Sequence, residues 1–319
     1  MKKNTYIERM SYESFIYSLN KAHEMSGKSK VVLFFDILGS YLSHGADFAD
    51  YSMLGFWDLN KEEKKTYITD ARNSELIKKY NDKKYFPLLE ERHLFNEKFQ
   101  NYLQRDFFYI DDNFDEFERF IKDRDEIIVK TNLKNGNVKI QKMLVPKKSE
   151  AWKLYKQLEK NKFSVIEEVL QVHPELVKLA GPDQVSIHFT TLYKENDSFL
   201  INAFLKVEGE TTFVTPIDLD TGKTKDVGCD SDLLLYEKHP ITHKKIEGFK
   251  IPYFKEAKEC VLQASKELPR LRYVDWNILI GEDGPAITSA TPYPNYSFYQ
   301  FPIHTHHRGL LPIIEEIDK

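Results

Sequence analysis

The feature that most constrains the fold is the segment Tyr273–Tyr296, which reads YVDWNILIGEDGPAITSATPYPNY. Its first half alternates two kinds of residue, as a strand with one buried face does. Apolar side chains stand at Val274, Trp276, Ile278 and Ile280, and the intervening residues are Asp275, Asn277 and Leu279. The second half alternates likewise, so Ile287, Ser289 and Thr291 are expected to share a face. The segment therefore predicts an antiparallel hairpin.

A five-residue loop, Gly281–Pro285, would fix the register of this hairpin. It would set Asn277 opposite Ser289 and Asp275 opposite Thr291. Directly opposed residues lie about 5 Å apart at Cβ. The four polar side chains are therefore expected to form one cluster on one face of a sheet.

The rest of the chain divides into a helical front and a part that mixes helices and strands. Long polar stretches with apolar residues at helical spacing dominate the first hundred residues, whereas strand patterns dominate from Val185 onward. The change falls near Asp111, at DDNFDE. We expect an α+β protein with mostly antiparallel strands, divided into a helical region at residues 1–110 and a second domain at 111–319.

Bulk properties exclude several classes of protein. The 319 residues carry a net charge of -4, so no basic field suits a general binder of nucleic acid or anionic membrane. The longest apolar run, Val31–Phe35, is far too short to span a bilayer. Only Cys229 and Cys260 are present, without a pairing pattern, which predicts a reducing, cytoplasmic location.

Five blocks of sequence resemble a known family. They read DYSMLGFWDLNKEEKKTYIT, RHLFNEKFQNYLQRDF, EEVLQVHPELVKL, HPITHKKIEGFKIPYFKEA and ELPRLRYVDWNILIGEDGP. In order and spacing, from about Asp47 to Gln300, they are similar to the sugar-transfer-associated ATP-grasp family, which is related to alpha-L-glutamate ligases. The resemblance implies an ATP-grasp fold, in which two α+β lobes clamp a nucleotide, behind a helical N-terminal region.

The resemblance also implies a chemistry and a setting. Family members usually accompany glycosyltransferases in surface-polysaccharide biosynthesis. ATP phosphorylates a carboxylate, an amine displaces the phosphate, and metal ions neutralise the developing charge. The partner would be a glycan or small-molecule carboxylate, or a biosynthetic partner enzyme.

The resemblance assigns nucleotide roles to two stretches. Lys130 would reach phosphates as a point charge, although a solvated lysine at a strand end is the simpler alternative. The segment Glu167, Glu168, Val169 and Leu170 would pair with adenine within a hinge at residues 165–172, or would be an ordinary strand-to-helix junction. The phosphate loop of the family is rich in glycine, whereas NLKNGNVK has only Gly136 and is more simply a hairpin turn.

The same comparison points to substituted catalytic positions. His188 stands where the family has an arginine that suits phosphate oxygens, and histidine is a weaker, pH-dependent charge. The family's magnesium ligands, an Asp, a Glu and an Asn, correspond here to Asn277, Ser289 and Thr291. Magnesium usually takes one or two carboxylates. Asp275 is the acid left on that face, and it would either compensate or be a partly solvated strand residue.

Two functions follow from these residues. One is a carboxylate–amine ligase-like protein with a degraded metal site, for which His188, Asp275 and Asn277 are the candidate catalytic residues. The other is an inactive pseudo-ligase that binds a glycan, a nucleotide or a partner enzyme. For both, the substitutions predict weak binding of ATP with little dependence on Mg²⁺.

Overall fold

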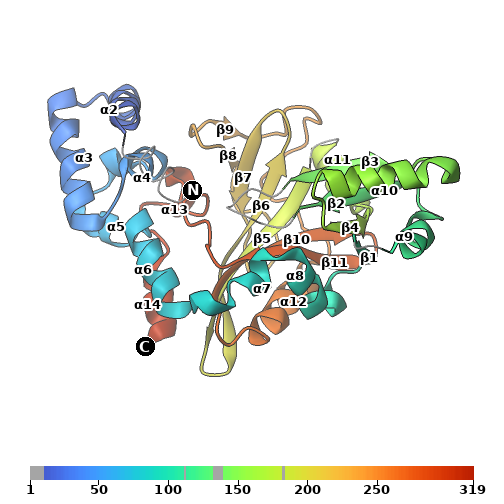
Figure 1. Ribbon diagram of the computed structural model, residues 1–319. Coiled ribbons are helices and arrows are strands. Elements are labelled where there is room, and N and C mark those ends of the chain that lie inside the picture. The colour runs from blue at the N-terminus through green and yellow to red at the C-terminus, as the bar shows by residue number, and fades with distance from the viewer. Residues whose placement is uncertain (1–10, 111–112, 132–138, 182–183) are drawn as a thin grey trace.

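A computed structural model describes the chain except for residues 1–10, 111–112, 132–138 and 182–183. The predicted turn at Asn135–Gly136 therefore lies outside the described residues. Helices dominate the first hundred residues and antiparallel sheets the remainder, which confirms the α+β class (Figure 1). Within the described ranges, no helix is long and apolar enough to cross a membrane.

Capping residues divide the N-terminal region into a series of separate helices. Ser11 caps the first of them through Ser14 N, at 3.1 Å, and Gly27 ends it in the left-handed region, with φ 69°. The polar stretch at residues 59–82 forms two separate helices, Lys61–Lys65 and Asp70–Tyr80. The α-helices before the first strand are α2 (Tyr12–Ser26), α3 (Lys30–His44), α4 (Phe48–Met53), α5 (Lys61–Lys65), α6 (Asp70–Tyr80), α7 (Pro87–Glu90) and α8 (Arg92–Phe99).

The smaller sheet has four antiparallel strands in the order β1-β4-β2-β3. Two helices, α9 (Phe114–Ile121) and α10 (Ala151–Lys160), bury their apolar faces against it around Phe117, Tyr155 and Ile166. Its strands are β1 (Phe107–Tyr109), β2 (Glu126–Lys130), β3 (Ile140–Leu144) and β4 (Val165–Glu168).

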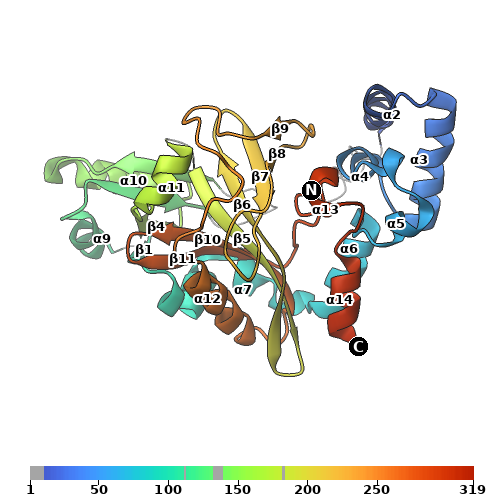
Figure 2. The ribbon, with the colours of Figure 1, turned by 180° about the vertical axis from the view of Figure 1, so that it is seen from behind.

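The larger sheet has seven antiparallel strands in the order β11-β10-β5-β6-β7-β8-β9. One of its faces packs against α12 (Phe254–Lys266) and against α7 and α8, and Trp276 and Phe99 meet edge to face in this core (Figures 1 and 2). Its strands are β5 (Gln184–Lys194), β6 (Asp197–Glu208), β7 (Thr212–Pro216), β8 (Gly228–Cys229), β9 (Leu235–Tyr236), β10 (Tyr273–Gly281) and β11 (Gly284–Thr291). A further helix, α11 (Pro174–Ala180), lies between the two sheets in the chain.

The last part of the chain returns to the N-terminal helices. It carries α13 (Pro302–Thr305) and α14 (Leu311–Asp318), which lie beside α4, α5 and α6 in both ribbon views (Figures 1 and 2). The amide of Gln300 pairs with both backbone groups of Ile68, at 2.9 Å each, and Tyr296 donates to Asp50, at 2.6 Å. The C-terminal segment therefore ties the helical region to the sheet.

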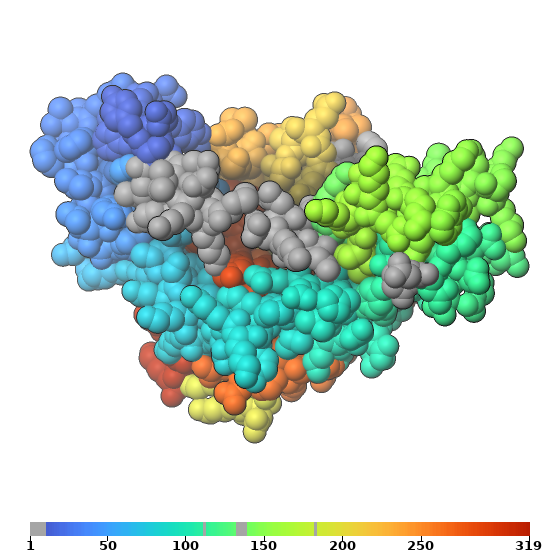
Figure 3. Space-filling view, viewed as in Figure 1, coloured from blue at the N-terminus to red at the C-terminus, as the bar shows by residue number. Residues whose placement is uncertain are grey.

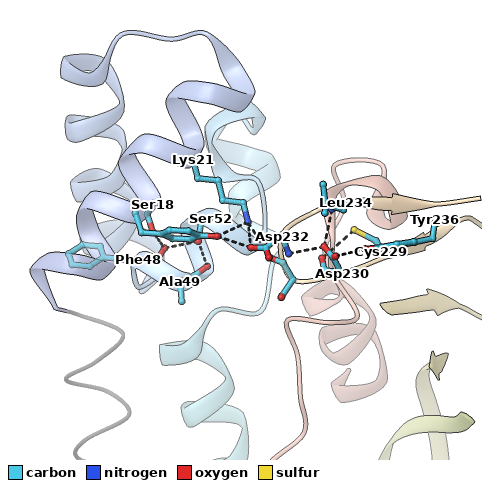
Figure 4. Close-up of polar contacts among 12 residues, drawn as sticks. Ser18, Lys21, Phe48, Ala49, Ser52, Cys229, Asp230, Asp232, Leu234 and Tyr236 are labelled. Carbon is cyan, nitrogen blue, oxygen red and sulfur yellow. Dashed lines mark hydrogen bonds and ion pairs between the residues drawn. The ribbon is translucent and has the colours of Figure 1, made fainter. Parts of the chain in front are cut away.

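A second polar contact joins the helical region to the edge of the larger sheet (Figure 4). Tyr17 donates to Asp232 Oδ1 at 2.8 Å, and Lys21 donates to the carbonyl of Ser231 at 3.2 Å. Asp230 shapes the receiving loop by accepting hydrogen bonds from the backbone N–H of Asp232 and Leu234, at 2.9 and 3.0 Å. The division of the chain after residue 110 stays a prediction.

Candidate nucleotide and metal site

The hairpin of β10 and β11 has the predicted register at its polar residues. Asp275 lies opposite Thr291, and Asn277 opposite Ser289. The predicted loop is wrong, because Gly281 already pairs with Gly284 and only two residues make the turn. Thr288 is an extra residue that forms a bulge, and the resulting shift of one residue brings Asn277 opposite Ser289.

This bulge also changes which residues share a face. Ile287 lies opposite Ile278 and is fully buried in the apolar core, whereas Ser289 lies opposite Asn277 on the polar face. The expectation that Ile287 and Ser289 share a face is therefore wrong. The extra residue makes a strict two-residue alternation impossible across Thr288.

His188 joins the polar face from the neighbouring strand. It lies opposite Asn277 in the pairing of β5 with β10, and Thr190 lies opposite Asp275. The imidazole stacks on Phe204, with ring centroids 4.7 Å apart, and its Nε2 lies 3.2 Å from Ser186 Oγ. Its Nδ1 lies 3.7 Å from Asp275 Oδ1, which is too long for a hydrogen bond. Ser186, His188 and Asp275 therefore form no continuous proton relay.

Asp275 is buried and its carboxylate is engaged by the C-terminal segment. Tyr299 donates its hydroxyl to Oδ1 at 3.0 Å, and the backbone N–H of Asn295 donates to Oδ2 at 3.3 Å. Burial, and then the Asp275 charge, raise the pKa of Tyr299 well above its ordinary value, so the phenol stays a donor. In this arrangement Asp275 anchors residues 295–299 to the sheet.

The remaining predicted metal positions offer neutral oxygens. Thr291 Oγ1 accepts from Tyr293 N at 3.2 Å, and Asn277 Oδ1 is buried without a hydrogen-bond partner among the described residues. Over those same residues, no group of three or more His, Cys, Asp or Glu side chains comes together. Since Mg²⁺ prefers carboxylate ligands, this donor set does not fit it.

A second polar cluster gathers around Glu167 on β4. Lys130 Nζ and Arg105 Nε both lie 2.6 Å from Glu167 Oε2, and Asn96 donates to Oε1 at 3.3 Å. These side chains are buried, and Arg92 on α8 is a further buried cation that lies close enough to sense the charge of Glu167. Two cations, Lys130 and Arg105, thus share one carboxylate.

This excess of positive charge shifts the pKa values in the cluster. Burial alone would raise the pKa of Glu167, but the charges of Lys130 and Arg105 outweigh it and lower the pKa to about 2. Burial lowers the pKa of Lys130 to about 8, and Arg105 and Arg92 add to that effect against the pull of Glu167. Arg105 Nη2 is buried and has no partner in the described part of the chain. The cluster therefore favours an anion.

Arg105 connects this cluster to the hairpin. Its Nη1 donates to the carbonyl of Ile287 at 2.9 Å, while its Nε holds Glu167. The connection after β4 reaches the same hairpin, because Val172 bridges Gly281 and His173 N donates to Ile280 O at 2.9 Å. Figure 3 shows the helical region, in blue, and the smaller sheet with its helices, in green, on opposite sides of the molecule, with part of the larger sheet, in yellow, between them.

The other residues of the predicted adenine segment lie at the end of β4 and in the connection that follows it. Glu168 accepts from Asp106 N at 3.2 Å and lies 3.9 Å from Arg124. Val169 and Leu170 are half-buried and follow β4 without joining a strand ladder. Lys130 is buried and paired, so it is not a solvated strand-end lysine. The nucleotide roles of these residues stay predictions.

Sequence reasoning missed Arg92, Asn96 and Arg105. The burial of Arg92 and Asn96 could have been predicted, because they share the helical spacing of the buried Phe95 and Phe99 on α8. It was not predicted because arginine on a polar helix is usually solvated.

Solved structures of ATP-grasp enzymes resemble this fold at low sequence identity. The ATP-grasp ligase PsnB, complexed with a minimal precursor, matches with a TM-score of 0.46 and 12% identity over 75% of this chain and 63% of that chain. N5-carboxyaminoimidazole ribonucleotide synthetase from Thermotoga maritima matches with a TM-score of 0.40 and 10% identity, over 72% and 50%. D-alanine–D-alanine ligase from Bacillus anthracis gives 0.37 and 13%, over 72% and 63%. The chain thus spans less than two thirds of the length of each of these enzymes.

A search of curated proteins gave no match. The family model for sugar-transfer associated ATP-grasp proteins matches residues 71–319, which is most of the chain. This confirms the resemblance seen in the sequence blocks. The chain belongs to the sugar-transfer associated ATP-grasp family.

Proposed function

We propose that this protein is an ATP-grasp ligase-like protein that binds an adenine nucleotide but has lost the usual magnesium-dependent phosphoryl transfer. The observation that carries the proposal is the state of Asp275, the acid on the hairpin face predicted to hold metal. Its two carboxylate oxygens are taken by Tyr299 and Asn295. Asn277, Ser289 and Thr291 add only neutral oxygens, which bind Mg²⁺ poorly.

The cluster around Glu167 supports the nucleotide half of the proposal. Lys130 and Arg105 supply more positive charge than the one carboxylate of Glu167 neutralises, and Arg105 Nη2 lacks a partner among the described residues. Such a buried excess suits the phosphates of ATP. Val169 and Leu170 supply backbone groups outside the ladder for the adenine edge.

The setting we propose follows the family. A cytoplasmic protein of this kind would act beside glycosyltransferases in surface-polysaccharide biosynthesis. Its ligand would be a glycan or small-molecule carboxylate, or a biosynthetic partner enzyme. We also propose that the nucleotide-binding part comprises residues 111–319 with a hinge at 165–172, because the connection after β4 is where the two sheets are joined.

An active carboxylate–amine ligase is the second candidate. Asn277 Oδ1 is buried without a partner in the described ranges, and it lies beside His188 on the face predicted to bind metal. We propose that these two side chains would then contact a transferred group. In this case turnover would use His188, Asp275 and Asn277 in place of the family's metal ligands.

Calorimetric titration with ATP tests nucleotide binding and the loss of the magnesium site. We expect weak binding, and we expect Mg²⁺ to change the dissociation constant by less than about tenfold, or about 1.4 kcal/mol. Lys130→Met should abolish the binding, whereas the matched control Lys139→Met, at the exposed end of the neighbouring strand, should leave it unchanged. Tight binding that requires Mg²⁺ would contradict the loss of the metal site.

Rebuilding the metal ligands tests the hairpin positions directly. The triple variant Asn277→Asp, Ser289→Glu, Thr291→Asn places two carboxylates on directly opposed residues, where like charges repel. It should melt below the wild type without metal and recover with Mg²⁺ or Mn²⁺, since a ligand bound only by the folded state stabilises it. A variant that shows no metal response would contradict the proposed position of the site.

A further inference from the structure

Helix α3 exposes an apolar face to solvent along its whole length. We define this α3 outer face by the side of the helix that carries Val31, Val32, Phe35, Leu38, Gly39 and Leu42. Val31, Phe35 and Leu42 are 68%, 66% and 74% exposed. The helix forms one outer edge of the molecule in both ribbon views (Figures 1 and 2). No other described element covers this face.

The opposite side of α3 packs into the protein core. Leu33, Ile37, Ser40 and His44 are buried there. A helix that is apolar on both sides is normally buried on both. From the exposed fractions and typical side-chain areas, the outer face presents on the order of 500 Å² of apolar surface, near the upper end of what monomers leave uncovered.

The outer face carries no charge. Between Lys30 and His44 the helix has one ionised side chain, Asp36, and that carboxylate is held by Lys64 at 2.6 Å and by Tyr51 at 2.7 Å. A charged partner would therefore find nothing to pair with over three turns of helix. The surface suits another apolar helix.

Gly39 supplies a notch in the centre of this face. A Cβ added at Gly39 would meet no atom within 4 Å, so the space above it is open. Glycine inside a helix is unfavourable relative to alanine. A close approach by another helix would account for glycine here, because small residues let two backbones come near each other.

We propose that the α3 outer face is a homodimer interface in which two copies of α3 pack antiparallel. With a two-fold axis at the level of Ile37, Phe35 lies over Gly39 of the second copy, and Gly39 lies under Phe35 of that copy. The same register sets Val32 against Leu42. One surface thus supplies both knob and hole, which a two-fold contact requires.

Charge at the helix ends agrees with this arrangement. The register places Lys30, at the start of α3, beside the carboxyl end of the second helix at residue 44. A cation is favourable there because the helix dipole is negative at its C-terminus. Two faces together would bury about 1,000 Å², near the lower limit for a specific interface.

A lipid surface fits these observations less well. Helices that lie on membranes carry Lys and Arg on their polar face. In α3 the side away from the outer face is packed into the protein, and Lys30 is the only Lys or Arg of the helix. The second copy is therefore the occupant that the charge pattern supports.

Sedimentation equilibrium of the full chain tests the dimer. The wild type should dimerise at micromolar concentration, and Phe35→Glu should weaken dimerisation at least thirtyfold, as expected for a central aromatic contact. Leu144→Glu is the matched control, since Leu144 is 75% exposed on β3, away from α3, and its variant should dimerise like the wild type. Circular dichroism establishes that each variant is folded.

Gly39→Leu separates the interface from helix stability. Leucine is a better helix former than glycine and its Cβ meets no atom within 4 Å at this exposed site, so the folded monomer should melt at the same or a higher temperature. The same substitution fills the notch and should weaken the dimer. A wild type that stays monomeric up to about 100 µM, or a Gly39→Leu variant that dimerises unchanged, would overturn the proposal.

Disulfide cross-linking and vesicle binding complete the test. In a Cys260→Ser background, Leu38→Cys lies near the proposed axis and should cross-link two copies under mild oxidation, whereas Ser43→Cys lies far from it and should not. Equal cross-linking of the two variants would overturn the register.

A monomeric wild type that sediments with phosphatidylglycerol vesicles, and loses this binding with Phe35→Glu, would assign the face to a membrane and overturn the dimer.

Discussion

Replacing Glu167 by Gln tests the buried charge cluster at the base of the candidate nucleotide site. The pKa of Glu167 falls from an ordinary 4.5 to about 2 on folding. Such a carboxyl contributes roughly 3 kcal/mol to the free energy of unfolding at neutral pH. Because the folded pKa is lowered, this contribution is complete above pH 4.5 and is lost as the pH falls toward 2.

Glu167→Gln should therefore lower the free energy of unfolding by about 3 kcal/mol at pH 7, the low end for breaking a buried ion pair. It leaves Lys130 and Arg105 buried without their shared anion. Glu168→Gln is the matched control on the same strand. The side chain of Glu168 is 44% exposed, so its substitution should cost less than about 1 kcal/mol.

The assay is urea unfolding followed by circular dichroism, repeated between pH 2 and 7. The variant should lose much of the wild type's pH dependence below pH 4.5. Sulfate should restore part of its stability, since an anion that binds Lys130 and Arg105 favours the folded state. Equal costs for Glu167→Gln and Glu168→Gln would refute the charge cluster.

Three further predictions concern other polar contacts. The free energy of unfolding of the wild type should rise between pH 8 and 10.5, because in that range unfolded Lys130 keeps the proton that folded Lys130 releases. Lys130→Met should remove this rise, which unfolding midpoints at pH 8 and 10 measure. Tyr299→Phe removes a hydrogen bond to the buried Asp275 and should cost about 2 kcal/mol in the same assay, and no cost would contradict the anchoring role. Asp232→Asn should cost less than about 1 kcal/mol, since its side chain is 65% exposed, and a fall in melting temperature as large as that of Tyr299→Phe would contradict this.

The sequence predicts local elements well where one periodicity decides them. The alternation around Trp276 predicts a half-buried hairpin, and Asn277 does lie opposite Ser289. The loop was predicted wrongly because two arrangements give the same register. A five-residue loop, and a two-residue turn with a bulge at Thr288, both place Asn277 and Ser289 together.

Contacts between distant parts of the chain could not be read from such patterns. Asp275 meets Tyr299 because the C-terminal segment folds back over the sheet, and no spacing in the sequence encodes that return. Arg105 meets Glu167 for the same reason, across 62 residues. The family resemblance predicts the fold that creates these contacts, yet the individual partners depend on this chain's own side chains.

The return of the C-terminal segment to the N-terminal helices has a consequence for synthesis on the ribosome. Tyr296 bonds to Asp50 across 246 residues, and Gln300 completes the backbone bonding of Ile68 across 232. At typical translation rates this interval lasts roughly 10–50 s. During that time the helices around Asp50 lack the C-terminal segment that packs against them, and the apolar α3 outer face is exposed as well. A chaperone that shields nascent chains would have its main task in this interval.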